Sequence, residues 1–458
     1  MMILKVKDIL EVCKAKLIQG NEDLVLNNFS KDSRTINKED VYIAIRGENF
    51  DGNKFFDQVY QKGSSIWILD RIDETLDVNK YNDCTIILVE DTVKCMQTLA
   101  QYIRSQINLP IVAVTGSVGK TSTKEMISSV LEQKYKVLKT QGNNNNDIGL
   151  PFTMLNLKDE EVIVLEMGMN HLKEISLLSE IAKPTIAVIT NVGTAHIGNL
   201  GSKENILKAK MEIMDGMEQT GTIIINNDYP LLKDYNEFKV DHILRFSIHN
   251  QSDFQATNII NFNNQTSYKL EGNKIEVPIM GDAFVYNSQA AYLVGRELGL
   301  TIKEIQTGIK KFKQVGNRMK IETVGQMTII NDTYNANLEA MQSALDYLSK
   351  YEGKRKIAVL GDILELDNFS QEIHEQIGKL VVENKIDLLY TTGEASIHVI
   401  NSAIASGMNS NKTKHLTKEE IGQLLLSDQQ EGDIVLFKAS NSIKLNEVIE
   451  NIKKIIRN

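Results

Sequence analysis

Cysteine is scarce in this sequence of 458 residues, and its three copies, Cys13, Cys84 and Cys95, form neither a CxxC pair nor a metal-ligand spacing. So odd and sparse a set excludes a disulfide framework and predicts a reducing compartment. No apolar run reaches the roughly 18 residues that span a bilayer, and the first residues lack a signal-peptide pattern. We therefore expect a cytoplasmic protein without stable membrane insertion.

A positive net charge is also missing. The 60 acidic residues outnumber the 51 lysines and arginines, which gives a formal net charge of −9. Neutralising phosphates along a nucleic acid requires a basic face, so we exclude nucleic acid as the main partner. The composition is that of a globular protein, with 42% hydrophobic and 24% charged residues and only five prolines. A chain of this length exceeds one ordinary core, so about three domains are expected.

Three stretches with different patterns follow one another along the chain. Residues 1–106 mix short strands and helices, and we expect a small α/β domain there. Residues 107–318 contain short continuous apolar runs separated by helical patterns, which predict a parallel sheet covered on both faces. Residues 319–458 have the same character and predict a second doubly wound, Rossmann-like unit. The expected strands lie at 41–45, 65–69 and 85–89, at 111–114, 162–165, 186–189 and 222–225, and at 357–360, 387–390 and 434–437.

Two further segments qualify this α/β, three-domain prediction. Residues 240–280 have asparagine-rich turns and alternating polar and apolar residues, so we expect an antiparallel appendage there. Residues 287–298 are predicted to be helical. No internal repeat is evident, and the tract at 143–146 is the one patch of low complexity.

A glycine-rich turn joins the run at 111–114 to a helical pattern. Glycines allow backbone N–H groups to approach a phosphate, and the start of the helix contributes the positive end of its dipole. Lys120 is expected to reach terminal phosphates, and the Thr121 hydroxyl to bind Mg²⁺. Val114 stands where the longer GxxxxGK[ST] pattern has glycine, which disfavours a kinase or general NTPase. The turn reads Thr115-Gly116-Ser117-Val118-Gly119-Lys120-Thr121.

Two more functional candidates follow strands of the same predicted sheet. Glu166 comes directly after the run at 162–165, and His196 follows the run at 186–189 by a short loop. In open parallel sheets, ligands bind beyond the carboxyl ends of the strands. A carboxylate there can hold Mg²⁺. Taken alone, Glu166 could equally be a surface group, and a single histidine is more often structural.

The blocks at 140–151, 166–169, 191–196, 201–204 and 331–337 together resemble the Mur ligases, and the resemblance covers nearly the whole chain. Segments 32–34, 41–48 and 51–52 resemble the family's UDP-binding domain. The resemblance implies an ATP-dependent ligase of cell-wall precursor synthesis. It would add a D-alanyl-D-alanine-like dipeptide to a UDP-muramoyl-tripeptide through an acyl phosphate. The same resemblance favours a monomer.

The resemblance also assigns roles to individual residues. It makes Lys120, Glu166, His196 and Lys210 the catalytic set, and Thr121, Glu166, His196 and a carbamylated Lys210 the Mg²⁺ ligands. The implied ATP-binding residues are Thr115, Gly116, Ser117, Gly119, Lys120, Thr121, Asn287, Arg318, Asp332 and Asn335. The implied substrate-binding residues are Ser33, Arg34, Asn143, Asn145, Asn146, Lys438 and Ser440. Without the resemblance, Lys210 would pass for a lysine on a solvated helix face.

The sequence departs from the family pattern at several positions. Ala283-Phe284 stands in place of a typical His-Asn pair, and the usual Lys-Gly-Ser-Arg block reads Lys438-Ala439-Ser440-Asn441. An arginine there would be a natural partner for a substrate carboxylate, and Asn441 cannot form that ion pair. Two alternatives therefore stay open: a related Mur-type ligase with a different amine substrate, and a degenerate nucleotide-binding paralogue.

Overall fold

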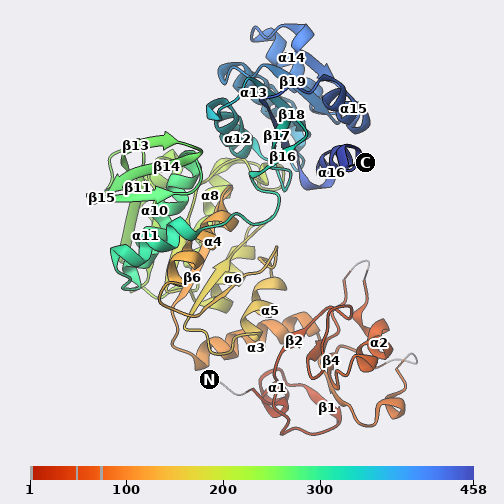
Figure 1. Ribbon diagram of the computed structural model, residues 1–458. Helices are drawn as coiled ribbons and strands as arrows, with labels where there is room; N and C mark the ends of the chain where they lie inside the picture. Colours follow the sequence, from red (N-terminus) through yellow and green to blue (C-terminus); the bar gives the residue numbers. More distant parts are fainter. Residues whose placement is uncertain (1–3, 48–49, 73–75, 458) are drawn as a thin grey trace.

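The structure is a computed structural model that describes residues 4–47, 50–72 and 76–457. Four sheets are distributed over three blocks that follow one another from the N-terminus to the C-terminus (Figure 1). Glu48, at the end of the matching segment 41–48, lies outside the described residues. Among those described, no helix combines the length and the apolar character needed to cross a bilayer.

The first block contains a five-stranded sheet in the order β1-β5-β4-β3-β2. The three predicted strands coincide with β3, β4 and β5, whereas β1 and β2 were not predicted. On one face of the sheet, an aromatic cluster contains Tyr42 and Trp67, both fully buried. The helix α3 (Thr92–Gln106) leads from this sheet to the central block. The other elements are α1 (Val6–Val12), β1 (Lys16–Gln19), β2 (Phe29–Ser30), β3 (Val41–Ile43), α2 (Phe56–Gln61), β4 (Ile66–Leu69) and β5 (Thr85–Leu88).

The central block is built on a seven-stranded sheet in the order β12-β11-β10-β9-β6-β8-β7, and every pair in it is parallel. Successive residues of β6 enter different cores, because side chains of a strand alternate between its two faces. The apolar runs are continuous for this reason: both faces are covered. The strands are β6 (Ile111–Thr115), β7 (Val137–Lys139), β8 (Val162–Glu166), β9 (Ile186–Ile189), β10 (Thr222–Asn226), β11 (His242–Ser247) and β12 (Phe254–Gln255).

Helices pack on both faces of this sheet. One face carries α4, α10 and α11, and the other carries α5, α6 and α8. Their bounds are α4 (Lys120–Leu131), α5 (Gly149–Leu155), α6 (Glu174–Ala182), α8 (Lys203–Met211), α10 (Asp282–Glu297) and α11 (Ile302–Lys311). Two shorter helices, α7 (Ile197–Leu200) and α9 (Pro230–Lys233), lie in the connections.

The antiparallel appendage is confirmed, but its expected start was wrong. The strands β13 (Thr257–Phe262), β14 (Gln265–Leu270) and β15 (Asn273–Val277) form a separate antiparallel sheet. Residues 242–255 instead extend the parallel sheet through β11 and β12. The strand β11, next to the edge strand β12, is only partly buried along its first four residues, and its mixed polar and apolar sequence resembles the alternation of an antiparallel strand.

The third block holds a six-stranded sheet in the order β16-β17-β21-β18-β19-β20. Only the hairpin β16–β17 is antiparallel. Helices α12, α13 and α14 cover one face, and α15 and α16 the other. The elements are β16 (Lys320–Val324), β17 (Met327–Asn331), α12 (Leu338–Lys350), β18 (Arg355–Gly361), α13 (Ser370–Glu383), β19 (Leu388–Thr392), α14 (Ile397–Ala405), β20 (Thr413–His415), α15 (Lys418–Asp428), β21 (Asp433–Lys438) and α16 (Asn446–Arg457).

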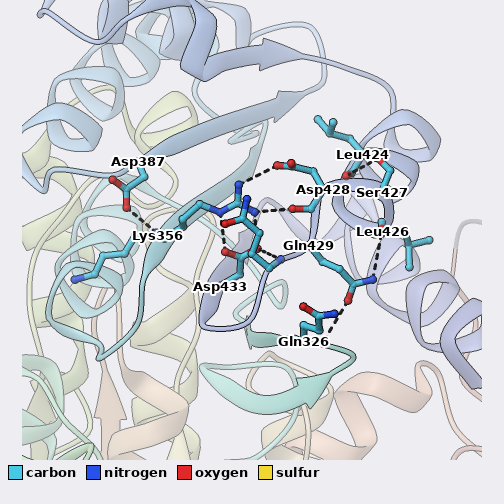
Figure 2. A network of polar contacts seen from close by, with 11 residues as sticks. Gln326, Lys356, Asp387, Leu424, Leu426, Ser427, Asp428, Gln429 and Asp433 are labelled. Carbon is cyan, nitrogen blue, oxygen red and sulfur yellow. Dashed lines mark hydrogen bonds and ion pairs between the residues drawn. The ribbon is translucent and has the colours of Figure 1, made fainter.

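A polar network fixes the amino-terminal end of this third sheet (Figure 2). Asp433, whose side chain is fully buried, accepts two hydrogen bonds from the Arg355 guanidinium, at 2.8 and 2.7 Å. The same guanidinium donates to the Asp428 carboxylate at 3.0 Å and to its backbone carbonyl at 2.7 Å. The network therefore joins the end of α15 to the first residues of β18 and β21.

We predict that Asp433→Asn destabilises the third block, because the amide cannot satisfy both guanidinium N–H groups. The expected loss is about 1–3 kcal/mol of unfolding free energy, measured by urea denaturation. Asp159→Asn is the matched control, because the Asp159–Lys136 pair is about two-thirds exposed, and it should leave stability unchanged. Equal stability of the Asp433 variant and the wild type would contradict the assignment.

Candidate active site

A cavity of about 940 Å³ lies between the central and third blocks. The phosphate-loop turn forms one wall, together with the asparagine tract and Glu166. Residues at the start of the third block, including Asp332, Asn335 and Asn337, form the opposite wall. The carboxyl ends of the central strands open into this cavity, as expected for an open parallel sheet.

The phosphate-loop turn runs from the end of β6 into α4, as the sequence predicts. Gly119 caps the helix in the left-handed conformation, with φ of 84°. A Cβ atom at Gly116 would lie 1.9 Å from the Thr190 hydroxyl oxygen, so no other residue fits there. The two glycines therefore set the path of the turn, and α4 begins with its free N–H groups facing the cavity.

Asn191 holds this turn from the neighbouring loop. Its side-chain oxygen accepts hydrogen bonds from the backbone N–H of Ser117 at 3.0 Å and of Val118 at 2.8 Å. The Ser117 hydroxyl accepts a bond from the Gly193 N–H at 2.8 Å. The N–H groups of Ser117 and Val118 are thus occupied within the protein. The N–H groups that follow them in the turn, at Gly119, Lys120 and Thr121, are left as the candidates for phosphate contact.

The Lys120 ammonium folds back onto its own turn and donates to the Gly116 carbonyl at 2.7 Å. Burial lowers its pKa, and the nearby Arg318 lowers it further, while Glu166 opposes both effects. A buried cation with so little compensation favours an anionic ligand.

Glu166 ends β8 and is buried, with 3% of its surface exposed. One carboxylate oxygen accepts from the Thr121 hydroxyl at 2.8 Å, and the other from the Asn145 amide at 2.9 Å. Two oxygen ligands of an octahedral Mg²⁺ lie about 2.9 Å apart, given metal–oxygen distances of about 2.0–2.1 Å. The Thr121 and Glu166 oxygens therefore already have the spacing that this ion requires.

His196 lies in the loop before α7, with a left-handed backbone (φ 63°). Its Nδ1 is 2.7 Å from the Glu365 carboxylate of the third block, so that Nε2 remains free for another partner. Burial lowers the pKa of His196, as does the neighbouring charge of Lys120. No cluster of three or more histidine, cysteine, aspartate or glutamate side chains that could hold a metal occurs among the described residues. A divalent cation would thus require further oxygen ligands.

Lys210 is buried in α8, with 1% of its surface exposed, and does not lie on a solvated helix face. Burial holds its pKa well below the ordinary value, and the charge of Lys120 acts in the same direction. Lys124, an equally buried lysine, is paired with Glu125 at 2.8 Å and donates to the Thr140 carbonyl at 2.6 Å.

The predicted nucleotide residues of the third block gather on the cavity wall. Asp332 and Asn335 line it, and so do Arg318 and Asn287 from the central block. The Arg318 guanidinium stacks 3.5 Å from the centre of the Tyr334 ring. The Asn287 oxygen accepts from the Thr123 hydroxyl at 2.9 Å, which ties α10 to the helix after the phosphate loop.

The predicted substrate residues do not all meet at this cavity. Asn143, Asn145 and Asn146 line it. Lys438 lines it too, but its ammonium is paired with Asp332 and donates to the Asn335 carbonyl at 3.0 Å. The other three, Ser33, Arg34 and Ser440, are not among the cavity-lining residues. Ser33 is buried, Arg34 is exposed beside Asp32, and Ser440 accepts from the Leu364 N–H at 3.0 Å.

Sequence reasoning missed the contacts that hold the third block against the central one. Glu339, near the start of α12, accepts from both the backbone N–H and the hydroxyl of Thr194, each at 2.8 Å. The Asn337 amide donates to the Ser117 carbonyl of the phosphate loop at 3.3 Å. No periodicity marks such contacts. An asparagine at position 337 is a residue type that caps helices, which indicates a helix start rather than a partner.

Comparisons with known proteins agree with this site. Residues 114–295 match the family model of the Mur ligase middle domain, and residues 317–441 match that of the Mur ligase glutamate ligase domain. The chain belongs to the Mur ligase family, and it is an ATP-dependent ligase of the type that joins an acid to an amino acid or peptide.

Among its curated relatives are two proteins named UDP-N-acetylmuramoyl-tripeptide–D-alanyl-D-alanine ligase. The one from Bacillus subtilis (strain 168) is 34% identical over 98% of both chains. The one from Escherichia coli (strain K12) is 33% identical over 95% of this chain and 96% of that one.

Solved structures show the same architecture. MurF from Acinetobacter baumannii superimposes with a TM-score of 0.88 at 27% identity, covering 99% of each chain. The MurF ligase from Thermotoga maritima, in complex with ADP, has a TM-score of 0.81 at 30% identity, covering 94% of this chain and 98% of that one.

We predict that Glu339→Ala loosens the docking of the third block. Hydrogen bonds to a charged group contribute about 1.5–3 kcal/mol, so the docked population should fall roughly tenfold or more relative to the undocked one. Small-angle X-ray scattering should then give a larger radius of gyration than for the wild type. Lys350→Ala, at the far end of the same helix, is the control. An unchanged radius in the Glu339 variant would contradict this role.

Proposed function

We propose that this chain adds D-alanyl-D-alanine to UDP-N-acetylmuramoyl-tripeptide, with ATP, in the synthesis of peptidoglycan precursor. The observation that carries this proposal is a cavity that the phosphate loop and the Glu166–Thr121 pair line and the third block covers. Full-length relatives whose names state this activity support the choice within the family.

Amide formation requires that the substrate carboxylate first acquire a leaving group. A carboxylate oxygen attacks the γ-phosphorus of ATP, the bond to the β-phosphate oxygen breaks, and an acyl phosphate and ADP result. The amine then attacks the acyl carbon, a tetrahedral intermediate forms, and phosphate leaves as the amine loses its proton. No protein nucleophile is needed. Lys120 and Arg318 offset phosphate charge, and the cavity walls orient the reactants.

The residues present fit Mg²⁺ as the accompanying ion. Thr121 and Glu166 offer oxygens at the required spacing, His196 keeps Nε2 free, and a carbamate on Lys210 would complete the set. When bound, the ion supplies charge neutralisation between phosphate and carboxylate oxygens. The contact between His196 and Glu365 fixes the orientation of the imidazole ring, as partners of metal-binding histidines do.

Carbamylation requires the neutral amine of Lys210, and burial favours that form over the ammonium. The nitrogen attacks the carbon of CO₂, an N–C bond forms, and one proton is released. The product carries two oxygens and a negative charge near Lys120, where burial disfavours the unmodified ammonium. Because burial lowers the pKa of Lys210, this amine gives up its proton more readily than that of an ordinary lysine.

We predict one carbamate signal when the protein is equilibrated with ¹³C-bicarbonate and examined by ¹³C NMR. The signal should vanish in Lys210→Arg, because a guanidinium does not react with CO₂ under these conditions. Lys124 serves as an internal control, because its ammonium is already paired with Glu125. Persistence of the signal in the Lys210 variant, or its absence from the wild type, would rule out the modification.

The three blocks divide the substrates between them. We assign the UDP moiety to residues 1–106, ATP to residues 107–318 and the incoming amine to residues 319–458, in a monomer that acts in the cytoplasm. The Lys31 ammonium of the first block donates to the Asn144 side chain at 3.2 Å. This bond supports a substrate path from the first block to the cavity along the asparagine tract.

The amine is the least constrained substrate. Asn441 is exposed, and its amide donates to the Tyr334 carbonyl at 2.9 Å, so it offers no charge to a carboxylate. A related ligase with a different amine is therefore the second candidate function. A panel of D-Ala-D-X dipeptides and other amines separates the two.

We predict that phosphate release from ATP requires both a UDP-muramoyl-tripeptide and D-alanyl-D-alanine. Purified protein with ATP and Mg²⁺ is tested with each substrate alone and with both, with phosphate and ligated product measured together. Lys120→Ala is the matched inactive variant. Release with another amine but not with D-alanyl-D-alanine would select the second candidate. No product with any amine would leave only the nucleotide-binding alternative.

A further inference from the structure

The fold brings Cys13 and Cys95 together although 82 positions separate them in the chain. Cys13 caps the end of α1, and Cys95 lies in the first turns of α3. Their sulfur atoms are 3.0 Å apart, and the Cys13 sulfur is also 3.5 Å from the Cys95 carbonyl. Both residues are free thiols in this structure.

The two thiols differ in access and in hydrogen bonding. Cys13 is half-buried, whereas Cys95 is buried with 4% of its surface exposed. The Cys13 thiol donates to the Cys95 carbonyl. The Cys95 thiol donates to the Cys13 sulfur, and this second bond lowers the pKa of Cys13, while the same bond, together with burial, raises that of Cys95. The more exposed of the two residues therefore carries the thiol that ionises more readily.

The backbones that carry the sulfurs are already held in place. Val6 and Ile9 of α1 lie in the same buried cluster as Met96 and Leu99 of α3. The two thiols therefore face each other from helices that pack together in one core. Cys84, the third cysteine, lies in a different cluster, and burial raises its pKa to about 12.

We propose that Cys13 and Cys95 form a reversible disulfide, with a hydroperoxide as the oxidant and a dithiol as the reductant. The site is independent of the proposed ligase activity, since it uses none of the cavity residues.

The disulfide forms in two steps. The Cys13 thiolate attacks the near oxygen of the hydroperoxide. The S–O bond forms, the O–O bond breaks, and the leaving alkoxide or hydroxide takes a proton. The resulting sulfenic acid is then attacked by the sulfur of Cys95. The S–S bond forms, the S–O bond breaks, and water leaves with the thiol proton. A dithiol reverses this by thiol–disulfide exchange.

The disulfide would join α1 to the helix that connects the first block to the central one. The side chain of Gln97, in the next turn of α3, donates to the Asp147 carbonyl at 3.1 Å, beside the asparagine tract. Figure 1 shows α3 between the first and central blocks, with α1 beside it. The bond would therefore stiffen the connection between the first and central blocks.

The test is peptide mass spectrometry of the full chain after treatment with hydrogen peroxide. We expect one cross-linked pair of peptides containing Cys13 and Cys95, a loss of two hydrogen atoms, and full reversal by dithiothreitol. The oxidised protein should also unfold at a higher temperature, because the bond restricts the unfolded chain.

Single-cysteine variants distinguish the proposed disulfide from non-specific oxidation. Cys84→Ser should form the same bond. Cys95→Ser should leave a sulfenic acid at Cys13 that dimedone traps, and Cys13→Ser should leave Cys95 unmodified. Alkylation of both thiols after oxidation, a pair that includes Cys84, or an intermolecular dimer on a non-reducing gel would each overturn the proposal. Circular dichroism of every variant confirms that these outcomes are read on folded protein.

Discussion

Positive charge at the cavity and beside it is the constraint on which the rest of the site depends. Lys120 is half-buried and Lys210 is buried; the charge of Arg318 lowers the pKa of Lys120, and the charge of Lys120 lowers that of Lys210. Among the described residues, Glu166 opposes the effect on Lys120, and Glu339 opposes the effect on Lys210. Taking cations out of water is costly unless anions accompany them. The cavity therefore favours the anionic phosphates of a nucleotide.

The same charge distribution explains why the site is divided between blocks. The central sheet presents the phosphate-binding groups on its carboxyl edge, but that edge is open to water. The third block covers it and brings Glu339 to Thr194 and Glu365 to His196. Excluding water from the cavity strengthens each interaction between charged groups inside it. Contacts between the blocks therefore contribute to the chemistry as well as to the fold. These contacts leave no periodic pattern in the sequence.

Much of the fold could be predicted because the central strands are buried on both faces. Continuous apolar runs such as 111–114 and 162–165 have few other interpretations, and the glycines at 116 and 119 mark the turn from the first run into the following helix. Lys210 could not be placed by pattern, since a lysine in a helix normally faces water. The strand β11 was misassigned because it is covered less completely than the central strands. Glu339 and Asn191 were missed because their partners are remote in sequence, and only the assembled backbone brings them within reach.

The bond between the Lys120 ammonium and the Gly116 carbonyl has a consequence for turnover. The Gly116 carbonyl and the nucleotide phosphates compete for the Lys120 ammonium, so an incoming nucleotide must displace the carbonyl. Breaking this hydrogen bond lowers the affinity of the loop for the nucleotide. When ADP leaves, the Lys120 ammonium returns to the Gly116 carbonyl. The return of the ammonium to the carbonyl favours rapid release of ADP over tight binding of ADP. It suits an enzyme whose nucleotide must enter and leave in every catalytic cycle.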